Sequence, residues 1–90
     1  MKTITRYCIS IVPARSGVRQ IYGANQGRNF KDTPEAMRQF LKAIQESPGN
    51  REALDSEHLF GPGAFDSLAV SPVECYENGD AVSIFPKETL

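Results

Sequence analysis

Hydrophobic residues recur with helical spacing in residues 33–46, which read TPEAMRQFLKAIQE. Met37, Phe40, Leu41 and Ile44 occupy positions i, i+3, i+4 and i+7, so they share one face of a helix. Charged and amide side chains fill most of the opposite face. The pattern predicts an amphipathic helix whose apolar stripe needs a sheet to cover it.

The flanking residues predict where this helix begins and ends. Thr33 can accept a hydrogen bond from a first-turn N–H, Pro34 suits the first helical position, and Glu35 places negative charge at the positive end of the helix. The segment Ser47-Pro-Gly-Asn50 follows the last helical turn. Because proline and glycine are strong helix breakers, we expect the helix to end there.

The first part of the chain predicts a hairpin. Residues 3–12 (TITRYCISIV) are rich in β-branched and aromatic side chains, which are typical of a strand. Apolar groups fall on both faces, with Ile9 on one and Cys8 on the other, so we expect a central strand. A turn at residues 13–17 then leads into a returning strand over residues 18–22.

A weaker helical pattern follows the main helix. We expect Asn50 to cap a short helical segment over residues 51–59, with Ala53 and Leu54 as its apolar positions. Gly61-Pro-Gly63 then ends this segment, because two glycines and a proline cannot continue a helix.

The last third of the chain predicts a second hairpin. Residues 65–70 (FDSLAV) indicate a strand that continues past a bulge, an edge or a break at Ser71-Pro72. Asn78-Gly79 separates it from the apolar residues 81–85 (AVSIF), and this arrangement is the strongest short-range hairpin signal. We expect residues 86–90 to form a frayed tail.

Together these elements predict a single α+β domain over residues 1–90, with the order strand, strand, helix, short helix, strand, strand. Two hairpins would form an antiparallel sheet of about four strands. The main helix, residues 33–46, would lie across one face as a two-layer sandwich. A ferredoxin-like arrangement is the alternative, but it places the helices differently in the order.

The charge is unevenly distributed along the chain. Residues 1–42 carry eight basic and two acidic side chains, a net charge of +6. Residues 43–90 carry two basic and nine acidic ones, a net charge of −7. This polarity predicts either two faces of opposite sign or two halves that pair within one sheet.

No apolar run approaches the ~20 residues of a membrane helix, and Arg6 interrupts the first apolar stretch. We therefore expect a cytoplasmic protein with no membrane partner. Cys8 and Cys75 fall on separate predicted strands. Two buried, reduced thiols are the expected state, and a disulfide between them is the alternative.

The sequence gives little support for an enzyme. Its one histidine, His58, could in principle pair with Cys75 or Cys8, but nucleophilic catalysis needs a third group that orients the base, and no spacing predicts one. The scattered carboxylates do not have the spacing of metal ligands. We expect no catalytic residues, no metal site and no cofactor.

The leading hypothesis is a small non-enzymatic module that binds another protein or a second copy of itself, as an accessory, adaptor or inhibitor protein. Phe60 and Phe65 flank a glycine-rich apolar loop and are the candidate anchors, unless they close the end of the core. Arg15 and Arg19, at the first hairpin, would pair with carboxylates of the partner.

The alternative hypothesis is binding of nucleic acid or of a phosphate-containing ligand. Arg15 and Arg19 at the hairpin would act with Arg28 and Lys31, which precede the main helix. The sequence pI of about 5.7 opposes this hypothesis, since nucleic-acid-binding domains are usually strongly basic.

Overall fold

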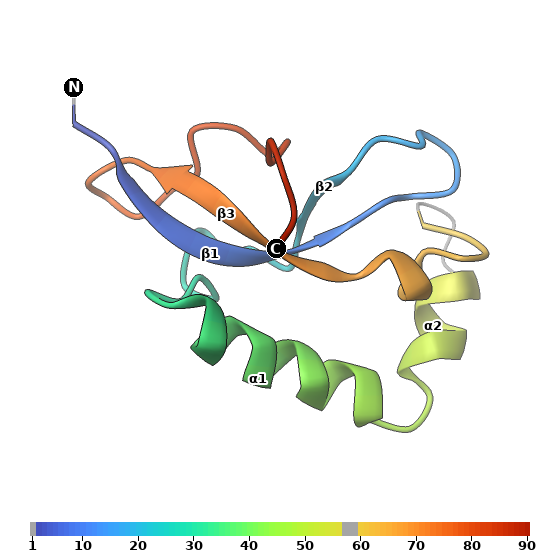
Figure 1. Ribbon diagram of the computed structural model, residues 1–90. Coiled ribbons are helices and arrows are strands. Elements are labelled where there is room, and N and C mark those ends of the chain that lie inside the picture. Colours follow the sequence, from blue (N-terminus) through green and yellow to red (C-terminus); the bar gives the residue numbers. More distant parts are fainter. Residues whose placement is uncertain (1, 57–59) are drawn as a thin grey trace.

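The computed structural model describes residues 2–56 and 60–90, and its helices and strands are shown in Figure 1. The strands are β1 (Ile4–Ile11), β2 (Gln20–Tyr22) and β3 (Ala69–Cys75), and the helices are α1 (Pro34–Glu46) and α2 (Asn50–Ser56). A single 3-10 turn, Phe65–Ser67, precedes β3. The α+β class expected from the sequence is confirmed.

The three strands form one antiparallel sheet in the order β2-β1-β3. Ile9 of β1 pairs with Tyr22 of β2 on one side and with Val70 of β3 on the other. Strand β1 is thus the central strand, as its apolar residues on both faces predicted.

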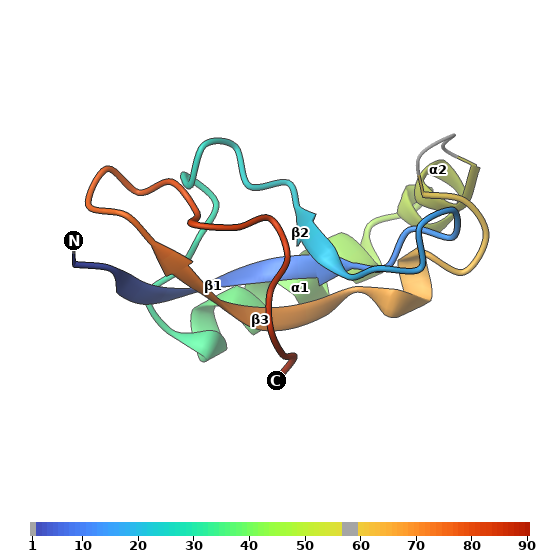
Figure 2. The ribbon, with the colours of Figure 1, turned by 90° about the horizontal axis from the view of Figure 1, so that it is seen from above.

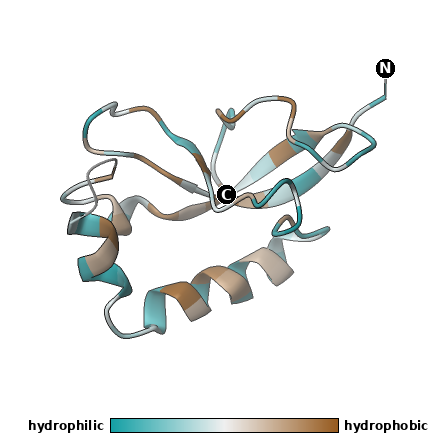
Figure 3. Cartoon of the chain, turned by 180° about the vertical axis from the view of Figure 1, so that it is seen from behind, coloured by the Kyte–Doolittle hydropathy of each residue, from teal (hydrophilic) through white to brown (hydrophobic). Residues whose placement is uncertain are grey.

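Helix α1 begins as the sequence predicts. Thr33 is extended, and its Oγ1 accepts a hydrogen bond from the N–H of Ala36 at 3.2 Å. The helix lies against one face of the sheet, below it in Figure 1. Of the predicted apolar stripe only Met37 is buried, whereas Phe40 is 37 % exposed. Hydrophobic and hydrophilic residues alternate along the helix (Figure 3).

The two faces of β1 contribute to different apolar clusters. Ile9 and Ile11 pack with Met37 of α1 and with residues from α2 and the 3-10 turn. On the other face, Cys8 packs with Phe30, Val73 and Cys75. The opposite face of the sheet is therefore also covered, by the loop before α1 and by the chain after β3 (Figure 2).

The predicted four-stranded, two-layer sandwich is not confirmed, because residues 81–85 do not form a strand. Ala81 forms only an isolated bridge with Cys75, and Val82 N–H donates to Glu74 C=O at 2.9 Å. Beyond this point the chain leaves β3.

Two prolines explain why the fourth strand stops. In the register set by the Ala81–Cys75 bridge, Ile84 would face Pro72 and Pro86 would face Val70 as hydrogen-bonded pairs. Proline has no N–H, so the carbonyls of Ile84 and Val70 would each lose their donor. Both carbonyls are paired elsewhere. Ile84 C=O accepts from Ile21 N–H of β2 at 2.7 Å, and Val70 C=O accepts from Leu90 N–H at 2.8 Å.

This explanation predicts that replacing both prolines extends the sheet. In the double variant Pro72→Thr, Pro86→Thr the missing donors are restored, so residues 82–86 should pair with β3. We expect amide hydrogen exchange at Ile84 to slow by about tenfold or more, as for other ladder amides. Pro48→Thr, in the exposed turn after α1, is the matched control. Unchanged exchange in the double variant would rule out the prolines as the cause.

The predicted strand at residues 65–70 is wrong over its first three residues, which form the 3-10 turn. Asp55 Oδ1 accepts the N–H of Phe65 at 3.1 Å, and Ser67 Oγ donates to Ala64 C=O at 2.6 Å. In both bonds a side chain pairs with a backbone group of this segment. Such bonds stabilise the turn and compete with an extended backbone. Strand β3 then runs through Pro72 without a break, because the missing N–H lies on the outer edge of the sheet.

Asn50 was expected to cap the second helix, but it is the first residue of α2. Its side-chain Nδ2 donates to the carbonyl of Ile44 at 2.9 Å, so it satisfies an orphan acceptor at the end of α1. The predicted end of the second segment, residues 57–59, lies outside the described residues. Within the described ranges, no helix combines the length and the apolar character needed to cross a membrane.

Candidate functional site

Both candidate anchor rings pack inward. Phe65 is 5 % exposed in the main core, and the guanidinium carbon of Arg51 lies 4.5 Å from the centre of its ring. Phe60 is half-buried, and its ring meets that of Tyr22 edge-on, with 5.6 Å between the ring centres. The two phenylalanines thus close one end of the core, which is the alternative that the sequence left open.

Arg19 is also turned inward. Its Nη1 donates to Ser10 Oγ at 2.9 Å and to the carbonyl of Ser67 at 2.8 Å. Ser10 Oγ in turn lies 2.7 Å from Ser71 Oγ, and both serines are fully buried. The guanidinium therefore satisfies polar groups of the sheet, and it is not presented to a partner at the hairpin tip. Arg15 lies in the exposed turn of that hairpin.

The two cations proposed for an anion site have different surroundings. The backbone of Lys31 pairs with Tyr7, and its Nζ lies 5.5 Å from the centre of the Phe40 ring on α1. Arg28 is exposed in a left-handed turn that includes Asn25 and Gln26 at φ of 50° and 58°. Lys31 thus extends along α1 towards Phe40, with its charge over an aromatic ring.

The cysteines are buried and free, as expected. Cys8 pairs with Ser71 and Cys75 with Ile4, so the two are offset by four residues of strand, about 13 Å. A disulfide spans only ~6 Å between Cα atoms, which excludes one here. Burial, and secondly the Coulombic effect of Cys75, raises the pKa of Cys8 from 9.0 to about 12.

Burial also raises the pKa of Cys75. Since the thiolate is the nucleophile, neither cysteine is prepared for nucleophilic attack. His58, the base proposed for Cys75, lies outside the described residues. Among residues 2–56 and 60–90, no three His, Cys, Asp or Glu side chains gather as metal ligands would.

The most distinctive surface belongs to residues 82–90, which we call the strap. The strap leaves β3, crosses the sheet to β2 and returns to the outer edge of β3 (Figure 2). A backbone hydrogen bond between Ile84 and Ile21 fixes the strap to β2, and one between Leu90 and Val70 fixes its end to β3. Four of its apolar side chains are 44–58 % exposed: Val82, Ile84, Phe85 and Leu90.

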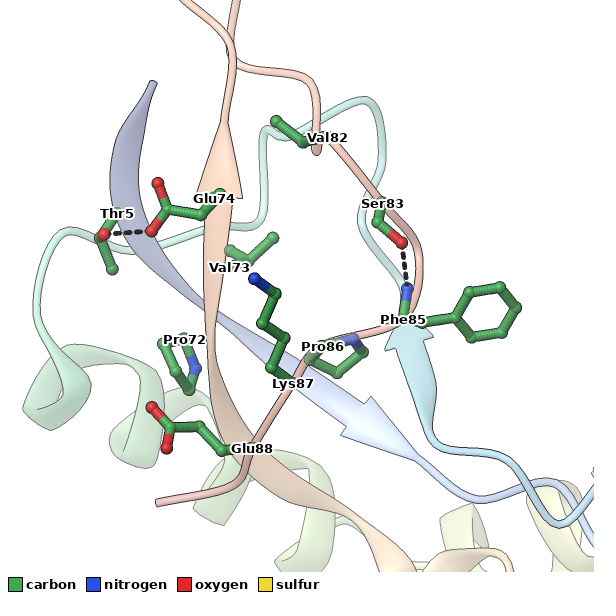
Figure 4. A pocket seen from close by; sticks show the side chains of 10 residues that line it. All are labelled: Thr5, Pro72, Val73, Glu74, Val82, Ser83, Phe85, Pro86, Lys87 and Glu88. Carbon is green, nitrogen blue, oxygen red and sulfur yellow. Dashed lines mark hydrogen bonds between the residues drawn. The ribbon is translucent and has the colours of Figure 1, made fainter. Parts of the chain in front are cut away.

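A groove of about 450 Å³ lies between the strap and β3 (Figure 4). Its sheet side consists of Thr5, Pro72, Val73 and Glu74. Its strap side consists of Val82, Ser83, Phe85, Pro86, Lys87 and Glu88. The volume lies within the range of small-ligand and peptide sites, and the lining combines apolar walls with a few charges.

The outer edge of β3 faces this groove. Tyr7, opposite Pro72, uses both its N–H and its C=O to bond Lys31, so the backbone groups of Pro72 point away from β1. By the same alternation, those of Val70 and Glu74 also point outward. Between the two strap bonds, the edge therefore offers the carbonyl of Pro72 and the N–H of Glu74.

Two hydroxyl groups of β1 and the residue before it hold the carboxylate of Glu74, which is part of the groove lining. It accepts hydrogen bonds from the hydroxyls of Thr5 and Thr3, the latter at 2.9 Å. Chiefly the Thr5 bond, and then the Thr3 bond, lowers the pKa of Glu74. Glu74 thus contributes a negative charge to the lining of the groove, and its side chain reaches Thr5 of β1 (Figure 4).

No family model matches this chain, and no significant match was found among the curated proteins or the solved structures. The candidate site therefore rests on the geometry alone. The sequence did not indicate the strap, because residues 81–85 carry a strand pattern and residues 86–90 carry no pattern. The two prolines, Pro72 and Pro86, could have indicated that the fourth strand does not form. That inference requires the register of the hairpin, which places Pro72 opposite Ile84.

Proposed function

We propose that this protein is a small non-enzymatic module that binds another protein or a second copy of itself, through the strap and its groove. The observation that supports this proposal is the concentration of exposed apolar side chains. Seven large hydrophobic residues are exposed within the described part of the chain, and four of them belong to the nine residues of the strap.

The physical reason is the cost of leaving such groups in water. Apolar side chains scattered singly on a surface are normal, whereas several within one short segment favour an interaction site. Phe85 adds an aromatic ring that is 51 % exposed, and aromatic rings are frequent anchors of interfaces. Phe85 therefore takes the role that the sequence suggested for Phe60 and Phe65. We place this activity in the cytoplasm, without a cofactor.

The test is affinity capture from an extract, with Phe85→Ala compared with Phe40→Ala. Both rings are exposed, but Phe40 lies on α1, on the opposite side of the sheet. We expect the wild-type protein and Phe40→Ala to retain equal amounts of the same partner. Phe85→Ala should retain about tenfold less of it, as for the loss of an interface anchor. Light scattering of the purified protein would identify a second copy as the partner.

Two results would contradict the proposal. Equal capture by Phe85→Ala would exclude the strap as the binding surface. Capture that nuclease abolishes and that depends on Arg28 and Lys31 would favour the nucleic-acid hypothesis, since that binding is electrostatic and falls steeply with salt.

A further inference from the structure

The Asn78-Gly79 motif lies in the exposed turn between β3 and the strap. The chain contains four asparagines, and only Asn78 precedes a glycine. Tyr76 N–H donates to Asp80 C=O, and Gly79 N–H donates to Tyr76 C=O, each at 2.9 Å. Residues 77–79 thus form a three-residue hairpin loop, and Gly79 takes the left-handed position of such a loop at φ of 97°.

The side-chain amide of Asn78 is held within the same turn. Its Oδ1 accepts the N–H of Asp80 at 3.0 Å, and its Nδ2 donates to Asp80 Oδ2 at 3.2 Å. The bond to Oδ1 draws electron density from the amide carbon and stabilises negative charge that develops on this oxygen. The backbone nitrogen of Gly79 is the nucleophile that can close a five-membered ring on that carbon. Because glycine has no Cβ, no side chain crowds this attack.

The turn has to open before the ring can close. In the closed turn, the N–H of Gly79 is committed to the carbonyl of Tyr76. This bond lies at an exposed loop tip, where local opening costs little free energy. Glu77 and Asn78 are both exposed, so water reaches the opened turn. The reaction therefore needs a local opening and no unfolding of the sheet.

We propose that Asn78 is a site of spontaneous deamidation, and that the isoaspartate product releases the strap from β3. The Gly79 nitrogen loses its proton to hydroxide and forms a bond to Asn78 Cγ. The Cγ–Nδ2 bond breaks, and Nδ2 takes up a proton and leaves as ammonia. Water then opens the five-membered ring at either of its two carbonyls. One opening gives aspartate, and the other gives isoaspartate, in which the backbone passes through Cβ and Cγ.

The longer backbone of isoaspartate acts on a tight contact of this turn. A Cβ built on Gly27 would collide with the carbonyl oxygen of Gly79, so the two backbones leave no spare room there. An extra backbone carbon before Gly79 changes the position of this carbonyl, which the contact cannot accommodate. The first strap bond follows shortly afterwards, from Val82 N–H to Glu74 C=O at 2.9 Å. Isoaspartate should therefore break this bond and leave α1 intact.

Ageing of the purified full-length protein, at neutral and at mildly alkaline pH, tests the covalent step. Peptide mass spectrometry follows each asparagine, and labelling by an isoaspartyl methyltransferase detects isoaspartate. We expect Asn78 to convert about tenfold or more faster than the other asparagines, because only Asn78 precedes a residue without a Cβ. The conversion should be faster at alkaline pH, since hydroxide removes the proton of Gly79. The internal controls are Asn25, Asn29 and Asn50, and equal rates at all four would overturn the proposal.

Amide hydrogen exchange of the isoaspartate fraction tests the effect on the strap. Exchange at Val82 should accelerate by about tenfold or more, and exchange at Met37 of α1 should stay unchanged. Unchanged exchange at Val82 would overturn the proposal. These measurements need no partner, so the site goes beyond the proposed protein-binding function and is tested independently of it.

Two variants separate the longer backbone from the other changes. Asn78→Gln, aged in parallel, is the matched control, because its longer side chain closes the ring far more slowly. Asn78→Asp carries the negative charge of the products without the extra backbone carbon. We expect both variants to keep the slow exchange of Val82, and circular dichroism establishes that they are folded. Fast exchange of Val82 in Asn78→Asp would assign the loosening to charge and would overturn the role of isoaspartate.

Discussion

Gly27→Ala should destabilise the protein by roughly 2–4 kcal/mol, a large effect for one methyl group. A Cβ built on Gly27 would lie 2.1 Å from the carbonyl oxygen of Gly79, well inside van der Waals contact. Gly27 also has a φ of +87°, which a side chain disfavours. Since the clash involves backbone on both sides, no side-chain rotation can relieve it. Urea denaturation at equilibrium measures the loss.

Gly23→Ala is the matched control for this prediction. Gly23 belongs to the same loop and has a similar φ of +65°, but no atom lies within 4 Å of the added Cβ. It should therefore cost only the backbone strain, about 1–2 kcal/mol. Equal losses in the two variants would mean that the contact between Gly27 and Gly79 contributes nothing.

The contact also has a consequence for the candidate site. It joins the loop before α1 to the turn that follows β3, and that turn leads directly into the strap. Loosening it should therefore disturb the strap before it disturbs α1. In Gly27→Ala, we expect amide exchange to accelerate more at Val82 than at Met37.

Arg19→Ala should destabilise the fold by about 2–3 kcal/mol, and should affect partner binding only through that loss. The guanidinium donates to Ser10 Oγ and to Ser67 C=O, and its removal leaves buried acceptors without this donor. Unsatisfied buried polar groups are costly because no water can replace the lost bond. The same denaturation experiment measures the effect.

Arg28→Ala provides the comparison, since Arg28 is exposed. Surface substitutions of this type usually change the stability by less than about 0.5 kcal/mol. If Arg19→Ala were as stable as Arg28→Ala but failed to retain a partner, Arg19 would be a contact residue, as the sequence suggested. A stability loss with normal affinity at low temperature would instead assign it to the fold.

Local patterns in the sequence predicted the elements that are stabilised locally. The bounds of α1 followed from Thr33, Pro34 and the breakers after Glu46, because capping and helix propensity act over a few residues. The two apolar faces of β1 likewise predicted its central position. These features hardly depend on which distant residues come to lie beside them.

The predictions that failed involve distant partners. Phe65 begins a 3-10 turn because Asp55, ten residues earlier, accepts its N–H. The strand pattern of residues 81–85 is overridden because Pro72 cannot donate to Ile84, while Ile21 can. A local pattern contains no information about the register that brings such residues together.

The sequence by itself determined the α+β class, the helix that follows Thr33 and the buried state of Cys8 and Cys75. Hydrophobic periodicity and capping depend only on residues that are close together in the sequence. Only the tertiary structure decided the number of strands, the inward direction of Arg19 and the groove beside Lys87. Each of these depends on backbone hydrogen bonds and contacts between residues far apart in the chain. The candidate site therefore depends on the tertiary structure, because it forms only where the strap crosses the sheet.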